Sequence, residues 1–415
     1  MDEHILSEVG KIWRGWQEGE YQIHFICTGV AEAILHIFPD GTTMLLDCGD
    51  HPAITRLNYA VPVLPNPGRL AGDWIARYIK RVLPEGYQTK NDLPLIDYMV
   101  LSHFHSDHSG IGEWVCTNHE RRGLPGCYRS GFALAAEQLA FGKAIDRGWP
   151  FYDDPKPGAI PAEELDHMTR LYKALHRRDG LEIEKFRLGA KDQIVPLHSP
   201  ETVKDFEITN ITVNGKILCK DGSIKNLYEE KLKMPGGLNE NGMSLGMIIR
   251  YGKFSLFTAG DFSDKVPTAD GQVLEIEDAL AAELPKVDAA KINHHGHNSM
   301  PAKIVTALSA RIWLACIWDQ LHTLDHVMDR LSDRNLYPGP RMHFPTVFPK
   351  ERCESAADKA YVQDIAPEVK GMGAHVVITV PKGGETYRVT CLKATDESME
   401  ILGEYKFDSK GCDCP

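Results

Sequence analysis

An apolar run at residues 96–101 leads directly into the segment SHFHSDHSG at 102–110, and this junction is the strongest constraint on the fold. The segment brings four metal-binding side chains together: His103, His105, Asp107 and His108. Imidazole and carboxylate are ligands that zinc, manganese and iron share, and alternate residues of an extended segment point to the same side. We therefore expect His103 and His105 to bind one metal ion, and Asp107 and His108 to bind a second ion nearby.

Two later apolar runs end in residues of the same kind. Residues 254–261 read FSLFTAGD, so Asp261 follows a predicted strand, and residues 289–296 read AAKINHHG, with His294 and His295 at the end. Sheets of α/β proteins carry their sites at strand ends. A single histidine after a strand is more often structural than a ligand. Three strand ends of this kind nevertheless favour a dinuclear metal centre, in which Asp261 bridges the ions.

Strands and helices alternate in both halves of the chain. Residues 22–47 predict a β-hairpin, residues 72–83 predict a helix, and the alternation recurs from 254 to 331. Two strand-rich halves of this kind predict a layered α/β sandwich. The halves are assigned to residues 22–112 and 234–393, with an N-terminal extension at 1–21 and a C-terminal tail at 394–415.

Residues 113–233 are interpreted as a mostly helical insertion that rejoins the core from about residue 186. Helices are predicted over 132–147 and 162–178. The insertion is either a packing elaboration or a lid over the site. As a lid, it would offer an anionic substrate three arginines, Arg121, Arg122 and Arg129.

The charge balance limits the partners of this chain. Its 415 residues include 46 Lys+Arg and 58 Asp+Glu, which gives a net charge of −12. We therefore expect no strong nucleic-acid binding and favour a small or short anionic substrate. No apolar run approaches the roughly 20 residues of a membrane span, no signal peptide is recognised, and ten irregularly spaced cysteines fit a reducing compartment. We expect a cytoplasmic protein without a membrane partner; the sequence leaves its oligomeric state open.

The motifs together resemble a known fold. H-x-H-x-D-H at 103–108, LLDCGD at 45–50, AGD at 259–261 and HHG at 294–296 resemble the metallo-β-lactamase fold, a four-layer αββα sandwich with metals at the edge of its sheets.

Four segments also resemble one subgroup of this fold. Residues 23–50, NGMSL at 241–245, the stretch at 321–331 and the closing segment 373–389 are similar to the soluble hydrolase domain of ComEC-type competence proteins. The resemblance covers about 22–112 and 186–393. The subgroup's G-x-G-D turn is replaced by TGVAE at 28–32, and its transmembrane channel is absent, so DNA uptake is not implied.

The resemblance implies two divalent ions, with zinc favoured over manganese. It places His103 and His105 on the first ion, Asp107 and His108 on the second with His295 or His294, and Asp261 between them. Asp47 and Asp50 are expected to orient the metal-bound histidines, while Asn241 and Ser244 support the site or contact substrate. A further histidine of the first site has no convincing counterpart, since His198 is the only candidate nearby.

The implied activity is hydrolysis by a metal-bound hydroxide, with a phosphoester or phosphodiester as the favoured substrate. Asp107 is expected to hold the hydroxide and accept its proton. His322 is expected to contact the substrate or leaving group; the alternative is a histidine packed structurally at a helix N-terminus. Two alternatives stay open: a lactone, lactam or thioester hydrolase of the same fold, and a catalytically silent binding protein.

Overall fold

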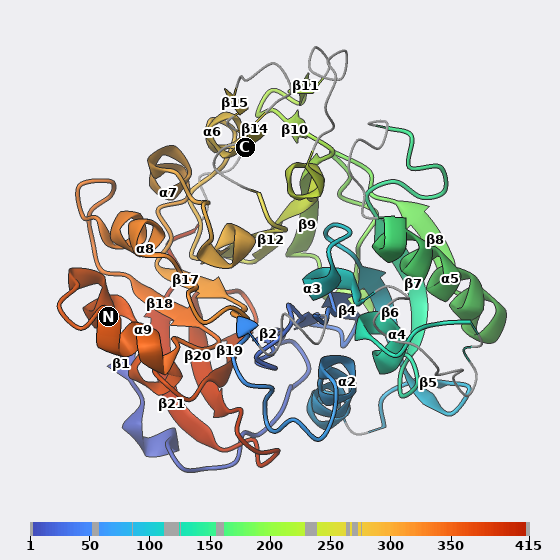
Figure 1. Ribbon diagram of the computed structural model, residues 1–415, viewed down its shortest axis with the longest axis horizontal. Helices are drawn as coiled ribbons and strands as arrows, with labels where there is room; N and C mark the ends of the chain where they lie inside the picture. Colours follow the sequence, from blue (N-terminus) through green and yellow to red (C-terminus); the bar gives the residue numbers. More distant parts are fainter. Residues whose placement is uncertain are drawn as a thin grey trace.

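Two β-sheets and the helices packed on them make up the protein in the computed structural model (Figure 1), which describes residues 3–51, 58–84, 86–111, 124, 126–154, 162–228, 239–262, 266–267, 273–274 and 276–411. This architecture confirms the predicted mixed α/β class. None of the helices in those ranges combines the length and apolar character that a bilayer crossing requires.

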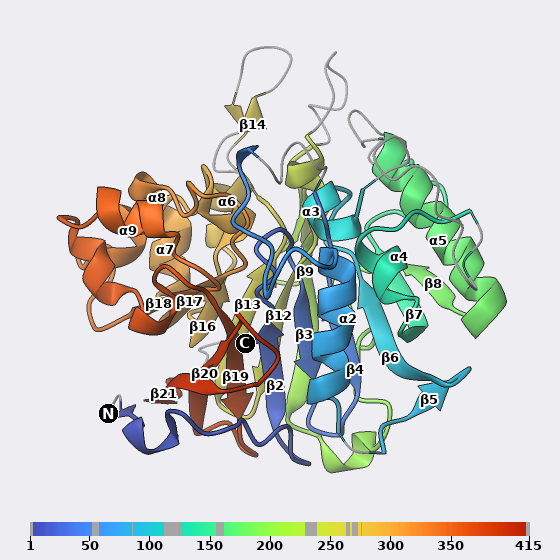
Figure 2. The same ribbon diagram turned by 60° about the horizontal axis from the view of Figure 1, so that its bottom comes forward.

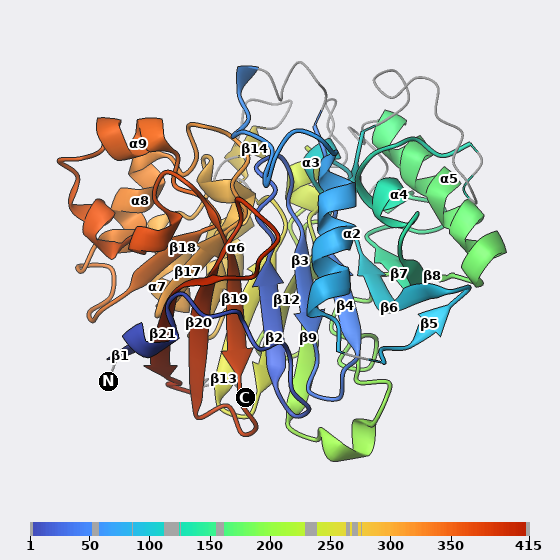
Figure 3. The ribbon, with the colours of Figure 1, turned by 90° about the horizontal axis from the view of Figure 1, so that it is seen from below.

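The first sheet contains strands from both ends of the chain. Its order is β1 (Glu3–His4), β21 (Ile401–Asp408), β20 (Thr386–Lys393), β19 (Ala374–Val380), β2 (Tyr21–Phe25), β3 (Ile34–Ile37), β4 (Thr43–Leu46), β6 (Leu93–Val100), β7 (Ala140–Asp146) and β8 (Glu182–Lys185), and β5 (Thr89–Lys90) pairs with β6. Antiparallel pairing joins β20, β19, β2 and β3, which run side by side in Figure 3.

The second sheet is built from the later half of the chain. Its order is β11 (Ile224–Asn226), β10 (Lys216–Leu218), β9 (Phe206–Val213), β12 (Gly246–Tyr251), β13 (Phe254–Ala259), β16 (Ala289–Lys291), β17 (Ile312–Ala315) and β18 (Met342–Pro345). A separate small ladder joins β14 (Val266–Pro267) and β15 (Val273–Leu274).

Helices lie on two sides of the strands, as Figure 2 shows for α4 and α5 on one side and α7, α8 and α9 on the other. The helices are α2 (Ala71–Val82), α3 (Ser106–Ser109), α4 (Gly131–Ala135), α5 (Ala162–Asp179), α6 (Ile276–Ala281), α7 (Ala302–Leu308), α8 (Asp325–Ser332) and α9 (Lys350–Ser355). In α2, buried Trp74, Ile75, Tyr78 and Ile79 form one apolar face, as the sequence predicts for this segment.

Alternating side chains bury both faces of the first sheet. In β4, Met44 and Leu46 pack into a core shared with the second sheet, whereas Leu45 packs into a core shared with α2, α4 and α5. Such two-sided burial explains why these strands read as nearly continuous apolar runs.

Three regions differ from the sequence predictions. The helix predicted over 132–147 is only the short α4, after which the chain forms β7, because pairing with β6 and β8 overrides the local helical pattern. The region interpreted as a helical insertion therefore supplies strands to both sheets as well as α5. Residues 401–408, placed in a tail, form β21, and Glu3–His4 of the N-terminal extension pair with it.

Parallel pairing brings the predicted strand ends together. In the first sheet β4 is parallel to β6, and in the second sheet β13, β16 and β17 are mutually parallel. Parallel neighbours end at the same edge of a sheet, so the residues after these strands gather in one place.

A fully buried ion pair connects the end of β7 to the segment before β12. Arg147 Nε and Nη2 donate to the two carboxylate oxygens of Glu240 at 2.6 and 2.8 Å, and both side chains are 0% exposed. Glu240 Oε1 also accepts a hydrogen bond from the backbone N–H of Phe104 at 3.0 Å. Removal of one partner leaves the other charge buried without compensation.

We predict that Arg147→Leu lowers the free energy of unfolding by about 3–5 kcal/mol, the usual cost of breaking a buried ion pair. The matched control is Arg170→Leu, because Arg170 pairs with Asp166 on the exposed surface of α5. The control should lose at most about 0.5 kcal/mol. Chemical denaturation of both variants measures the difference, and equal losses would contradict the predicted contribution of the buried pair.

Candidate metal centre

Loops at the ends of five strands place the candidate side chains. Asp47 follows β4, the segment 102–110 follows β6, and Asp261 follows β13. After β16, the 3-10 turn Asn293–Gly296 carries the two adjacent histidines, and Glu32 lies in the connection between β2 and β3.

Glycine allows two of these loops to touch. A Cβ atom on Gly49 would lie 1.8 Å from the carbonyl oxygen of Asp107. The backbone N–H of Glu32 also donates to that carbonyl, at 2.9 Å. The segment after β4, the connection after β2 and the metal-binding segment are thereby held against one another.

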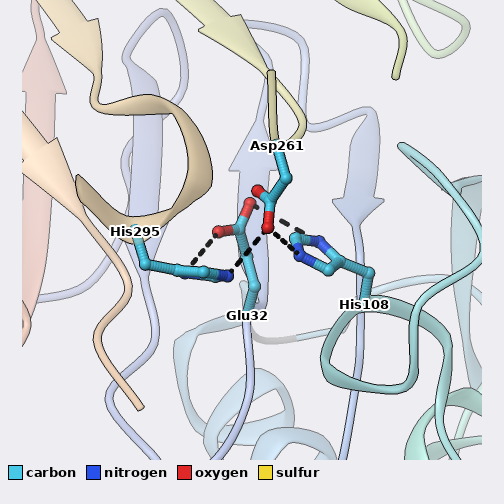
Figure 4. Close-up of side chains that lie close together, drawn as sticks. All are labelled: Glu32, His108, Asp261 and His295. Atoms are coloured by element: carbon cyan, nitrogen blue, oxygen red, sulfur yellow. Dashed lines mark hydrogen bonds and ion pairs between the residues drawn. The ribbon is translucent and has the colours of Figure 1, made fainter. Parts of the chain in front are cut away.

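Four buried residues form a group that can hold a metal ion: Glu32, His108, Asp261 and His295 (Figure 4). One potential ligand atom from each lies within 4.8 Å of the others. Asp261 Oδ2 is 3.0 Å from His108 Nε2 and 3.1 Å from His295 Nε2. Two imidazoles therefore converge on one carboxylate oxygen.

Asp107 approaches the same two nitrogens from the metal-binding segment. Its Oδ2 lies 3.1 Å from His295 Nε2 and 3.5 Å from His108 Nε2. The side chain of Asp107 is 10% exposed, whereas the side chains of His108, Asp261 and His295 are 2% exposed or less. Among these four side chains, Asp107 is thus the one that solvent reaches most easily.

Glu32 lies on the other side of both rings. Its carboxylate oxygens are 3.4 Å from His295 Nδ1 and 4.0 Å from His108 Nδ1. They are closer to the ammonium of Lys291, at 3.1 Å. Glu32 was not predicted as a site residue, because the G-x-G-D turn of the resembling subgroup is replaced here. The signal in the sequence was that Glu32 ends TGVAE where the subgroup's turn also ends in an acidic residue.

Hydrogen bonds fix the tautomer of both central histidines. His295 Nδ1 donates to the backbone carbonyl of Cys316 at 2.7 Å, and His108 Nδ1 donates to Asp47 Oδ2 at 2.8 Å. The Nε2 atom of each ring is left as the one available to an ion. Asp47 is held in turn by the N–H and hydroxyl of Ser102, both at 2.7 Å.

A second pair of imidazoles lies beside this group. His103 Nε2 is 3.1 Å from His105 Nδ1, and the ring of His103 lies 4.2 Å from that of His108, measured between centroids. His103 is buried and His105 is partly exposed. The structure thus brings the predicted ligands of both ions into adjacent positions.

The carboxylates set the charge of the group. Burial lowers the pKa of a histidine, but Asp261 and Asp107 outweigh it, raising the pKa of His295 to about 10 and that of His108 well above its usual value. The pKa of Lys291 is also raised above its ordinary value, because the opposing effect of burial is exceeded by the effect of Glu32 and Asp261. Positive charge at the Nε2 atoms is therefore strongly favoured.

The adjacent histidines 294 and 295 point to different partners. His294 Nε2 faces Asn241 Nδ2 at 3.4 Å, whereas His295 Nε2 faces the two aspartates. Burial lowers the pKa of His294 to about 4. The sequence left open whether His294 or His295 belongs to the metal group, and the geometry favours His295.

Other predicted residues lie around the group. Ser244 Oγ accepts from the backbone N–H of Asp261 at 2.9 Å, and Asp50 Oδ1 accepts from the N–H of His51 at 2.8 Å. His322 stacks on His295 with ring centroids 5.9 Å apart and planes inclined by 6°. Burial and the neighbouring His295 lower the pKa of His322 to about 2.

The remaining candidates lie elsewhere. His198 pairs with Asp97 at 3.2 Å, away from the strand ends that form the site, and is not a metal ligand here. Arg129 is 3.8 Å from Glu137. Arg121 and Arg122 lie outside the described residues, so the expected lid contacts stay a prediction.

Backbone strain coincides with the site. Asp47, His294 and His295 have positive φ angles of 60°, 49° and 50°. A side chain in this region costs on the order of 1 kcal/mol, and such residues persist where the surroundings hold them.

No protein-family model matches this chain, and no curated protein matches it either. The residues of the site are therefore the observations that bear on its function.

We predict that His295→Gln reduces bound zinc by about one ion per chain after saturation and gel filtration. His294→Gln, its matched control, should keep the wild-type content because its Nε2 faces Asn241 rather than the carboxylates. Elemental analysis measures both. Loss of zinc from the His294 variant alone would contradict the assignment.

Proposed function

We propose that this protein is a metal-dependent hydrolase of the metallo-β-lactamase fold that acts on a phosphoester or phosphodiester. The observation that carries the proposal is that two imidazole nitrogens and two carboxylate oxygens converge. Asp261 Oδ2 lies 3.0 Å from His108 Nε2 and 3.1 Å from His295 Nε2, and Asp107 Oδ2 lies 3.5 and 3.1 Å from the same two nitrogens.

These separations suit one metal ion. Bonds of about 2.0–2.1 Å in a tetrahedral zinc site separate neighbouring ligand atoms by about 3.3 Å. The donor set of two imidazoles and two carboxylates also suits zinc or manganese. In this proposal Asp107 is the fourth ligand of the ion, and Glu32 lies behind the imidazoles.

A second ion would be held by His103 Nε2 and His105 Nδ1, whose separation of 3.1 Å also fits one coordination sphere. Asp261 would bridge the two ions. Asn241 contacts His294, the neighbour of His295 in the chain. The Oδ1 atom of Asn241 is buried without a hydrogen-bond partner among the described residues. That oxygen, water or substrate would complete the poorer first site.

The arrangement of layers supports the fold assignment. Helices pack outside both sheets, the sheets share a core, and the site lies where parallel strands of both sheets end. These features suit a four-layer αββα sandwich with metals at its edge.

When bound, two divalent ions lower the pKa of a shared water and neutralise charge that develops on a phosphoryl oxygen. The residues of the chain orient this chemistry. Asp47 and the Cys316 carbonyl fix the imidazoles, and the relative exposure of Asp107 favours substrate approach from its side. Asp107 is also the group positioned to accept a proton there. His322, stacked on His295, is the proposed substrate contact.

A substrate panel tests the reaction class. Bis-(p-nitrophenyl) phosphate, a lactone and nitrocefin are offered to zinc- or manganese-loaded protein. Fastest turnover of the phosphodiester supports the proposal. Preference for the lactone or nitrocefin would favour the alternative hydrolases, and inactivity on all three with metal bound would favour a binding protein.

We predict that Asp261→Ala abolishes turnover while the fold is retained, because this carboxylate faces both central imidazoles and lies in the loop after β13 rather than within a strand. Asp192→Ala, which removes an exposed carboxylate, is the control and should retain wild-type activity. Steady-state kinetics and circular dichroism measure the two effects. Activity of the Asp261 variant within tenfold of wild type, about 1.4 kcal/mol of barrier, would exclude the bridging role.

A further inference from the structure

A buried lysine lies directly behind the candidate metal centre. Lys291 ends β16, is 0% exposed, and places Nζ 3.1 Å from Glu32 Oε1 and 3.7 Å from Asp261 Oδ1. It also donates to the carbonyl of Gly260 at 3.4 Å. A cation in this position repels a metal ion, so its presence needs a reason beyond general charge balance.

The two oxygens of Asp261 are used differently. Oδ1 faces Lys291, while Oδ2 faces His108 Nε2 and His295 Nε2. Rotation of this carboxylate would carry Oδ1 away from the ammonium. Lys291 therefore favours the orientation in which a single oxygen faces the proposed ion.

Glu32 holds Lys291 in turn. The carboxylate of Glu32 is 1% exposed. Among the described residues, Lys291 is its only lysine or arginine partner. Its backbone is fixed by the Asp107 carbonyl and by the N–H of Gly49, which donates to the Glu32 carbonyl at 3.2 Å. The pair is thus anchored to the loops that carry the ligands.

We propose that Glu32 and Lys291 are a positioning pair that holds Asp261 as a single-oxygen ligand and so strengthens metal binding, an inference that rests on the proposed metal centre. Partners that orient a metal ligand typically contribute 10–100-fold to metal affinity. The pair acts through Asp261 and touches neither ion nor substrate.

The decisive variant is the double substitution Glu32→Gln/Lys291→Met in the full chain. It removes one charge of each sign, so general electrostatics predicts an unchanged affinity, and it leaves no buried charge unpaired. The positioning role predicts zinc binding weakened 10–100-fold. Competition with a chromogenic chelator measures the zinc dissociation constant.

A control and a second variant sharpen the test. Lys253→Met/Glu385→Gln removes an exposed pair at the opposite end of β13 and should leave zinc affinity unchanged. Lys291→Met alone removes a positive charge, so electrostatics predicts tighter zinc binding, whereas loss of positioning predicts weaker binding. Circular dichroism checks that each variant is folded.

The visible spectrum of cobalt-substituted protein gives a readout that a purely structural pair would not change. We expect altered d–d bands in the double variant, because Asp261 is free to rotate or to use both oxygens. Unchanged zinc affinity and cobalt bands in the double variant, with metal bound by wild type, would overturn this inference alone. Wild-type protein that binds no metal would overturn the proposed function together with it.

Discussion

Buried carboxylates at the meeting edge of the two sheets are the constraint on which the rest of the site depends. A carboxylate removed from water is unfavourable unless cations or hydrogen-bond donors surround it. Asp261 satisfies this requirement with imidazoles on one oxygen and Lys291 on the other, and Asp47 satisfies it with Ser102 and His108. The positive charge drawn to the Nε2 atoms can come from protons or from a metal ion, and the ligand atoms of the buried group lie close enough together to hold an ion.

The fold supplies this edge through its pairing pattern. Parallel strands β4 and β6 end opposite the parallel strands β13 and β16, so their loops meet across the sandwich. The positive φ angles of His294 and His295 let two consecutive side chains face different partners. This strained turn explains how one histidine joins the carboxylates while its neighbour faces Asn241.

Much of this arrangement is predictable because its signals are contiguous. The segment 102–110 and the strand before it are adjacent in sequence, and the runs ending at Asp261 and His295 repeat the pattern. Glu32 was missed because its position follows from contacts between distant loops, and Lys291 was missed because it sits within a short strand. The strand β7 was predicted as helix, and β21 was placed in a tail, because both depend on pairing with strands remote in sequence.

The ion pair between Arg147 and Glu240 links stability to the geometry of the site. Glu240 accepts from the backbone N–H of Phe104, the residue between His103 and His105. It also directly precedes Asn241. The segment that places Arg147 follows β7, which belongs to the region first interpreted as an insertion. That region therefore does more than cover the sheet. It contributes Arg147, which pairs with the carboxylate that binds the backbone between two candidate ligands, so a change at this pair affects both folding and the geometry of the candidate site.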